Sequence, residues 1–389
     1  MNKKILTVAI AAALAAPATV LAEVTVYGQL HMSMDYTDSN TAVPAGTVGN
    51  KGNVGISSNS SRIGFKGAED LGGGLQAIWQ VESQVNLDKA NTTGTALTGT
   101  VAGGATGTIA TNNSATGALA NRDSFLGLSG GFGTVLFGKH DTPFKMFGRS
   151  LDPFADSIAD TRQLLGNTQG YGDPGFDLRA PNAIAYITPS FSGFQAVGAF
   201  VTGFNQNYVD VDNNKYTAVS LNATYTNGPA YVGFAFEQHN IKDMAGAGGK
   251  NPTAFRLGGS YAFGPAKVGA EWEHISNADL NALGGAERDG GTLFGTYGFG
   301  AETAKLALST VSNWKVDGTS MTDTKSSLVA LGLDHSFSKR TNAYVQYTKL
   351  LNKTNASYSL GGGGGYGDPL TPAVGGKPGA LSLGLIHKF

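Results

Sequence analysis

The chain has 389 residues, with 27 Lys plus Arg, 28 Asp plus Glu and a formal charge of −1 at pH 7, so no strong field favours nucleic acid or acidic lipid. Cysteine is absent, which excludes disulfides, thiolate metal sites and a cysteine nucleophile. The 57 glycines are well above the usual share and charged residues are only 14%, but aromatics at 10% argue against disorder.

Residues 1–22 have the features of a secretory signal peptide. Two lysines precede an apolar run over residues 5–16, and small or apolar residues lead to a predicted cleavage after Ala22. The run is shorter than the roughly 20 residues of a membrane-spanning helix, which disfavours the alternative of a transmembrane anchor. We therefore expect an exported protein with one mature domain, residues 23–389.

The mature chain alternates apolar and polar side chains with a period of two, which predicts β-strands. At the start, Val24 and Val26 share one parity while Gln29 and His31 share the other. Charges and amides occur in mid-strand on the polar parity. The predicted strands are residues 23–36, 54–67, 75–86, 121–129, 133–141, 180–188, 193–203, 216–226, 230–240, 253–263, 266–276, 288–299, 301–313, 326–337, 341–351 and 379–389.

The connections between these strands alternate in length. Short turns such as 227–229 and 264–265 alternate with long stretches rich in Gly, Asn, Thr and Ala, such as 87–121 and 353–378. Outer-membrane barrels have short periplasmic turns and long external loops, whereas a soluble sandwich has no reason for this regularity. Aromatic residues such as Tyr225 flank the short turns, as in a membrane-interface girdle, although hairpin-stabilising pairs give the same pattern.

These patterns predict an all-β protein, a 16-stranded antiparallel transmembrane β-barrel with short periplasmic turns and long external loops. The even strand number places both mature ends on the periplasmic side, where the first and last strands can pair. Closure is required because an unpaired edge in lipid leaves backbone groups without partners. A barrel this wide is not filled by its own side chains, so its lumen must hold water or a plug.

Several segments resemble the general Gram-negative porins, the family of trimeric 16-stranded diffusion channels. The likeness covers nearly the whole mature chain, and the loops carry little of it. The matching segments are residues 24–28 (VTVYG), 61–72 (SRIGFKGAEDLG), 74–82 (GLQAIWQVE), 122–128 (RDSFLGL), 132–139 (FGTVLFGK), 182–186 (NAIAY) and 189–194 (PSFSGF), with the terminal Phe389.

The resemblance implies that the third external loop, about residues 142–179, folds into the barrel and narrows it. It implies constriction acids on this loop at Asp152, Asp156 and Asp160, and the loop also contains Asp173 and Asp177. It implies pore-lining basic residues on the opposite wall at Arg62, Lys66, Arg122 and Arg179. On charge content alone, a solvated surface loop and snorkelling cations are the alternative. Acids and arginines facing each other across water would select solutes by size and charge.

The resemblance also implies a homotrimer in the cell outer membrane, in contact with membrane lipid and lipopolysaccharide. Phe389, with His387 and Leu385, resembles the family's assembly signal, which the barrel-assembly machinery reads. Small hydrophilic solutes are the expected cargo. No cofactor, metal or nucleic-acid partner is expected.

Three alternatives to a general diffusion channel stay open. A substrate-specific channel would need an aromatic slide or a saturable site in the lumen. An adhesin or receptor would use the loops, with the pore secondary. An outer-membrane lipase or protease would need a Ser/His or Asp/His pair at the rim, and the six histidines are scattered without metal-ligand spacing. We therefore do not expect an enzyme.

Overall fold

The computed structural model describes residues 23–38, 52–88, 119–167, 175–203, 217–241, 250–278, 285–361, 370 and 372–389, and the backbone of 97–100 and 106–109. The predicted signal peptide, residues 1–22, lies outside these ranges. Within them, no helix has the length and apolar character needed to cross a bilayer.

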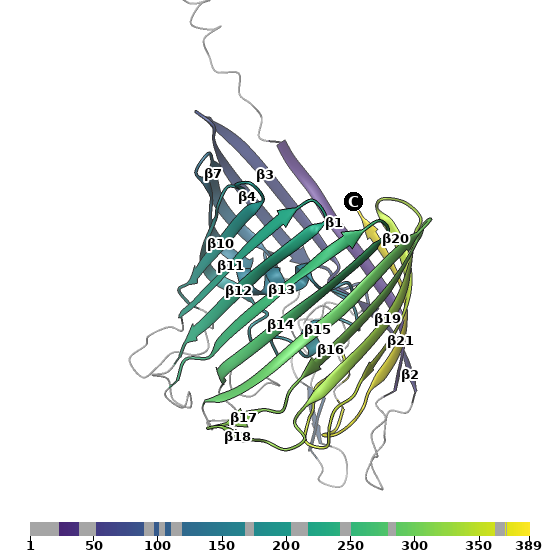
Figure 1. Cartoon of the computed structure of the whole chain (residues 1–389). Coiled ribbons are helices and arrows are strands. Elements are labelled where there is room, and N and C mark those ends of the chain that lie inside the picture. The colour runs from purple at the N-terminus through teal and green to yellow at the C-terminus, as the bar shows by residue number, and fades with distance from the viewer. Residues whose placement is uncertain are drawn as a thin grey trace, which may run out of the picture.

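The strands form one closed antiparallel barrel with strongly tilted strands (Figure 1). Each spanning strand pairs with its neighbours in chain order, and β1 pairs with β21 from Gln29 opposite Lys388 to Asp38 opposite Gly379. β2 and β3 together make one wall strand, and β17 and β18 form a small hairpin in an external loop, so 16 strands build the wall. The predicted all-β, 16-stranded barrel is confirmed.

The elements have the following bounds: β1 Glu23–Asp38, β2 Asn53–Ser58, β3 Arg62–Gly72, β4 Leu75–Gln84, β5 Leu97–Thr100, β6 Thr106–Ile109, β7 Ser124–Gly130, β8 Gly133–Asp141, α2 Pro143–Ser150, η1 Thr161–Gln163, β9 Arg179–Ile187, β10 Phe194–Val201, β11 Thr217–Asn227, β12 Ala230–Asn240, β13 Thr253–Phe263, β14 Ala266–Ala278, β15 Ala286–Phe299, β16 Glu302–Val311, β17 Lys315–Val316, β18 Thr319–Ser320, β19 Ser326–Ser336, β20 Thr341–Leu350 and β21 Gly379–Lys388.

The second wall strand is interrupted, which the sequence did not predict. The predicted segment 54–67 is split into β2 and β3, with Ser60 between them at a φ of 51°. The neighbouring strand stays bonded across the break, because the Asn59 amide donates to the His31 carbonyl (2.8 Å) and the His31 amide donates to Ser61 Oγ (2.9 Å). The break turns the Ser60 side chain towards the interior, where it meets the third loop.

The two faces of the wall follow the predicted alternation. Val24 and Val26 are 53% and 52% exposed on the outer face, whereas Gln29 and His31 are buried on the inner face. Three of the short turns place a glycine where a type II′ hairpin needs positive φ: Gly228, Gly264 and Gly300, at 55°, 61° and 63°. Both ends of the described chain lie at the short-turn end of the barrel (Figure 1).

The main apolar core lies inside the barrel, between the third external loop and the wall. We call this loop L3, residues 142–178, described except for 168–174. It carries the helix α2 and the short helix η1, neither of which the sequence predicted. The core is made of loop side chains such as Phe144, Phe147 and Phe154 against small wall side chains such as Ala235 and Ala330. The expected inward-folded third loop is therefore confirmed.

Candidate functional site: a lumen narrowed by a charged loop

L3 is seated on glycines of the inner wall. A Cβ atom at Gly332 of β19 would lie 2.8 Å from Phe154, and one at Gly258 of β13 would lie 2.6 Å from Leu151. Gly233 of β12 is related to Phe147 in the same way, at 2.9 Å. Real side chains essentially never approach so closely, so only glycine leaves room for the loop here. Part of the high glycine content thus shapes a seat for L3.

The helix α2 starts L3 and fixes it to the wall. Thr142 caps the helix, since its Oγ1 accepts from the Lys145 amide (3.3 Å), and Pro143 occupies the first turn, where it displaces no helix hydrogen bond. Two side chains of β11 bind the first turn: Ser220 Oγ accepts from the free Phe144 amide (3.0 Å), and Asn222 Nδ2 donates to the Pro143 carbonyl (2.7 Å). The loop therefore leaves β8 in a fixed direction, into the lumen.

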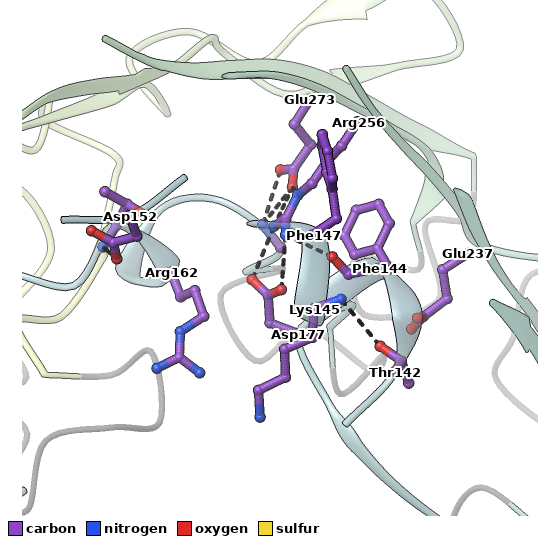
Figure 2. Close-up of polar contacts among 12 residues, drawn as sticks. Thr142, Phe144, Lys145, Phe147, Asp152, Arg162, Asp177, Glu237, Arg256 and Glu273 are labelled. Atoms are coloured by element: carbon purple, nitrogen blue, oxygen red, sulfur yellow. Dashed lines mark hydrogen bonds and ion pairs between the residues drawn. The ribbon is translucent and has the colours of Figure 1, made fainter. Parts of the chain in front are cut away.

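A buried ion-pair network holds the other end of L3. Arg256 of β13 donates through Nη1 and Nη2 to the two carboxylate oxygens of Asp177, both at 2.9 Å, and its Nε donates to Glu273 of β14 (2.9 Å) (Figure 2). The Arg256 and Asp177 side chains are 1% and 8% exposed. The Arg256 guanidinium also lies over the Phe144 ring, 4.1 Å from its centroid, so one cation joins both ends of the loop.

Among the predicted constriction acids, Asp156 meets the wall. Its oxygens accept two bonds from Arg149 (both 2.7 Å), and Arg62 Nη1 lies 3.8 Å from Oδ2. Arg162 Nη2 approaches to 3.5 Å and Ser60 Oγ to 3.3 Å. Although burial opposes the charged form, these cations, Arg149 first, hold the pKa of Asp156 well below its usual value. Asp156 is therefore an ionised centre between loop and wall.

Asp152 and Asp160 make their contacts within L3. Asp160 pairs with Arg162 (2.5 Å) and accepts from its amide at the start of η1 (2.9 Å). Asp152 accepts from the amides of Phe154 (2.8 Å) and Thr161 (2.9 Å), and burial together with nearby Asp160 raises its pKa to about 7. Asp177 is bound to Arg256, as described above. Asp173 lies outside the described residues.

Three of the predicted basic residues of the wall, Arg62, Arg122 and Arg179, have acidic partners. Glu82 of β4 lies between two of them, with Arg122 Nε at 2.5 Å from Oε1 and Arg62 Nε at 3.7 Å from Oε2. Glu82 also accepts from Tyr27 Oη (3.0 Å). A chain of charges therefore runs along the inner wall from Arg122 to Arg62 and on to Asp156 of L3.

Arg179 and Lys66 make separate contacts. Arg179 pairs with Asp123 (2.6 Å) and with Asp141 (3.0 Å), and Asp141 also pairs with Lys145 of α2 (2.9 Å). Lys66 lies on the inward parity of β3, with Nζ 5.2 Å from the centroid of the Tyr27 ring. The wall arginines are thus linked to Lys145 of α2 as well as to Asp156.

The C-terminal residues lie at the seam that closes the barrel. The Gly28 amide donates to the Phe389 carbonyl (3.0 Å), and the Phe389 amide donates to the Gly28 carbonyl (3.2 Å). The Phe389 ring covers Gly28, where an added Cβ would collide with it. His387 Nδ1 lies 2.9 Å from Thr341 Oγ1, and Leu385 is exposed on the outer face.

Sequence reasoning missed the cations of L3 and the acids of the wall. Arg149 and Arg162 lie in a loop without periodicity, so no pattern marked them as partners of Asp156 and Asp160. Glu82 and Arg256 were detectable, because each occupies the polar parity of a predicted strand. The described residues contain no group of histidine, aspartate and glutamate suited to a metal ion.

The geometry defines a class of protein: a closed β-barrel whose lumen is narrowed by an inserted loop with ionised side chains at its contact with the wall. A family model described as Gram-negative porin matches residues 6–355, and the chain belongs to this family. Porins are channels rather than enzymes, which confirms the expectation that this chain is not an enzyme.

Two curated relatives show the extent of the sequence likeness. The chain is 32% identical over 250 residues to major outer membrane protein P.IA of Neisseria meningitidis, covering 60% of this chain and 55% of that protein. It is 26% identical over 269 residues to an outer membrane porin protein of Bordetella pertussis, covering 64% and 62%. The match thus spans little more than half of the Neisseria protein.

Solved structures show the same fold at lower identity. The anion-selective porin from Comamonas acidovorans superposes with a TM-score of 0.73 and 24% identity, over 95% of this chain and all of that one. The trimer form of OmpT of Vibrio cholerae gives a TM-score of 0.60 at 17% identity, over 95% of this chain and 99% of that one. These likenesses support the barrel architecture.

Proposed function

We propose that the protein is an outer-membrane porin that passes ions and small hydrophilic solutes by passive diffusion. The observation that carries the proposal is a closed 16-stranded wall with L3 seated across part of its lumen. A barrel of this width is not filled by its own side chains, so the space beside L3 is a water-filled passage. Solutes would be selected by size and charge at the narrowest level, without a reaction.

The residues proposed to line this level are Arg62, Arg122 and Arg179, with Lys66 towards the short-turn end. Asp156 is the loop acid that faces them, since Arg62 lies 3.8 Å away. Asp152 and Asp160 act indirectly, through the shape of L3. Fixed charges on both sides of the passage would replace part of the hydration that a polar solute loses, whereas an apolar solute gains nothing.

Residues 1–22 are proposed to be a signal peptide, removed so that the barrel domain begins near residue 23, where β1 starts. The mature chain would assemble as a homotrimer in contact with outer-membrane lipid and lipopolysaccharide. The trimer form of the Vibrio cholerae OmpT supports this assembly. Phe389, with His387 and Leu385, is proposed to carry the signal for the barrel-assembly machinery, and its place at the closing seam suits that role.

Planar-bilayer recording of the purified protein tests the proposal. Stepwise ohmic openings in groups of three sublevels are expected for a trimeric pore. A protein that folds as a barrel, by its heat-dependent migration on detergent gels, yet stays electrically silent would contradict it. Native mass spectrometry or cross-linking in detergent tests the trimer separately from conduction.

A substrate-specific channel is the second candidate, because one sector of the inner wall is apolar. Phe125, Leu136 and Ile187 belong to one apolar cluster on β7, β8 and β9, and His140 lies against Phe125 with ring centroids 5.6 Å apart. Porin lumens are usually polar, so such a surface would favour solutes with an apolar part. Saturation of the current, or its block by an organic acid, would distinguish this function from general diffusion.

A further inference from the structure

The inner wall holds an arginine that joins several loops. Arg288 of β15 is 2% exposed. Its Nη2 donates to two carbonyls of L3, those of Leu164 and Asn167, both at 2.7 Å. Its Nη1 donates to the Oη of Tyr358 (3.0 Å), which lies in the last external loop. We call this loop L8, residues 351–378, described except for 362–369 and 371.

L8 also bonds and packs directly against L3. The Gly361 amide donates to Oε1 of Gln163 in η1, at 3.0 Å. Tyr358 and Leu360 of L8 are buried in one apolar cluster with Ile158 and Leu164 of L3. Two loops separated by about half the chain therefore share a core inside the mouth of the barrel.

The internal structure of L8 positions these side chains. Asn352, fully buried, donates through Nδ2 to the carbonyls of Tyr358 and Gly376, both at 2.9 Å, and accepts from Ser326 Oγ (2.8 Å). These bonds tie the two legs of L8 to each other and to β19. The described part of L8 is thus held by its own hydrogen bonds, which direct Tyr358 inwards.

A third loop contacts the same arginine. Trp314, in the connection that carries the β17–β18 hairpin, is 1% exposed and lies with its ring centroid 4.9 Å from the Arg288 guanidinium carbon. Glu273, which also binds Arg256, lies 3.5 Å from Arg288 Nη2. Arg288 is therefore surrounded by groups from three external loops and by one carboxylate of the wall.

We infer that L8 is a second element of the constriction, with Tyr358 and Leu360 as positioning residues that hold L3 in place through Arg288, Gln163 and Ile158. This inference rests on the proposed channel function and extends it.

A thiol reporter tests the contact without relying on conduction. The protein has no cysteine, so Ile158→Cys places a single thiol in the shared cluster. The rate at which a small water-soluble thiosulfonate modifies this thiol is measured in three proteins. They are Ile158→Cys alone, Ile158→Cys with Leu360→Ala, and, as the matched control, Ile158→Cys with Val374→Ala. Val374 is an L8 side chain that is 65% exposed, so its truncation leaves the shared core intact. Leu360→Ala is expected to raise the rate at least tenfold, about 1.4 kcal/mol of docking, and Val374→Ala to leave it unchanged.

Single-channel recordings of Leu360→Ala, Tyr358→Phe and Val374→Ala supply the functional readout. The first two are expected to show frequent conductance substates that the wild type and the control lack, in barrels that keep their thermal midpoint. Equal modification rates and equal recordings in all variants would overturn the inference, as would equal effects of Leu360→Ala and Val374→Ala. A silent wild type would instead contradict the channel function, while the thiol rates would still decide whether L8 holds L3.

Discussion

Replacing Asp177 by asparagine is expected to release one end of L3 while the barrel stays folded. Asp177 accepts two charge-assisted bonds from Arg256, and the replacement removes one and weakens the other. A hydrogen bond to a charged group contributes about 1.5–3 kcal/mol. Arg256 still pairs with Glu273 at 2.8 Å. The loss of docking free energy should therefore stay below the roughly 3–5 kcal/mol typical of a broken buried ion pair. We expect a loss of about 2–3 kcal/mol of docking free energy, which raises the undocked fraction of L3 about 30- to 160-fold.

The assay is the fraction of time that single channels spend in altered conductance states, with the thermal midpoint of the barrel measured in parallel. Asp289→Asn is the matched control, because Asp289 also has a basic partner, His274 at 3.1 Å, but is 48% exposed, where such pairs contribute little. The same gating in Asp177→Asn and the wild type would refute the reasoning. So would an equal change in Asp289→Asn, since the burial of the pair would then be irrelevant.

Three further predictions concern the passage and its loop. Replacing Arg62 and Arg122 together by glutamine removes two cations from the proposed pore lining. Reversal potentials in a salt gradient should therefore shift towards cation preference. Unchanged reversal potentials would contradict the proposal that these two arginines line the passage. Gly332→Ala should displace the Phe154 ring from the wall and alter the single-channel conductance. Gly198→Ala is the control, because nothing lies within 4 Å of the added atom, and it should leave the conductance unchanged. Equal conductance in the two variants would show that Gly332 does not make room for L3. The raised pKa of Asp152, about 7 against an ordinary value near 4, means that docked L3 is more stable when this carboxyl is protonated. That stability is lost as pH rises from about 4 to about 7, so substates should become more frequent over this range. Asp152→Asn should remove this dependence, and a variant that keeps it would assign the titration to another group.

The wall of the barrel was predictable because its constraints are local. A strand between lipid and water must alternate, so residues such as Val24 and Gln29 reveal their faces without any partner. The turns were equally readable, since Gly228 and Gly264 stand where a tight hairpin needs positive φ. The break at Ser60 was not predictable, because it depends on bonds to His31 of the neighbouring strand and on a loop nearly 100 residues away.

The interior of L3 was not predictable, because the loop has no period and its contacts are distant. Five aspartates suggested an acidic loop facing a basic wall. The structure gives three of the described ones separate tasks: Asp156 meets Arg62, Asp160 closes on Arg162, and Asp177 binds Arg256. Aspartates that look alike in the sequence therefore have different roles in the structure, because each pairs with a different cation.

These pairings change the field expected at the narrowest level. Asp160 is neutralised by Arg162 within the loop, and Asp156 has Arg149 and Arg62 as well as Arg162 around a single carboxylate. The two loop cations, Arg149 and Arg162, therefore balance the two loop carboxylates, Asp156 and Asp160, and the surplus cation at the contact is Arg62 of the wall. The charge preference of the passage should therefore depend on how completely Glu82 and Asp156 offset Arg62 and Arg122 of the wall.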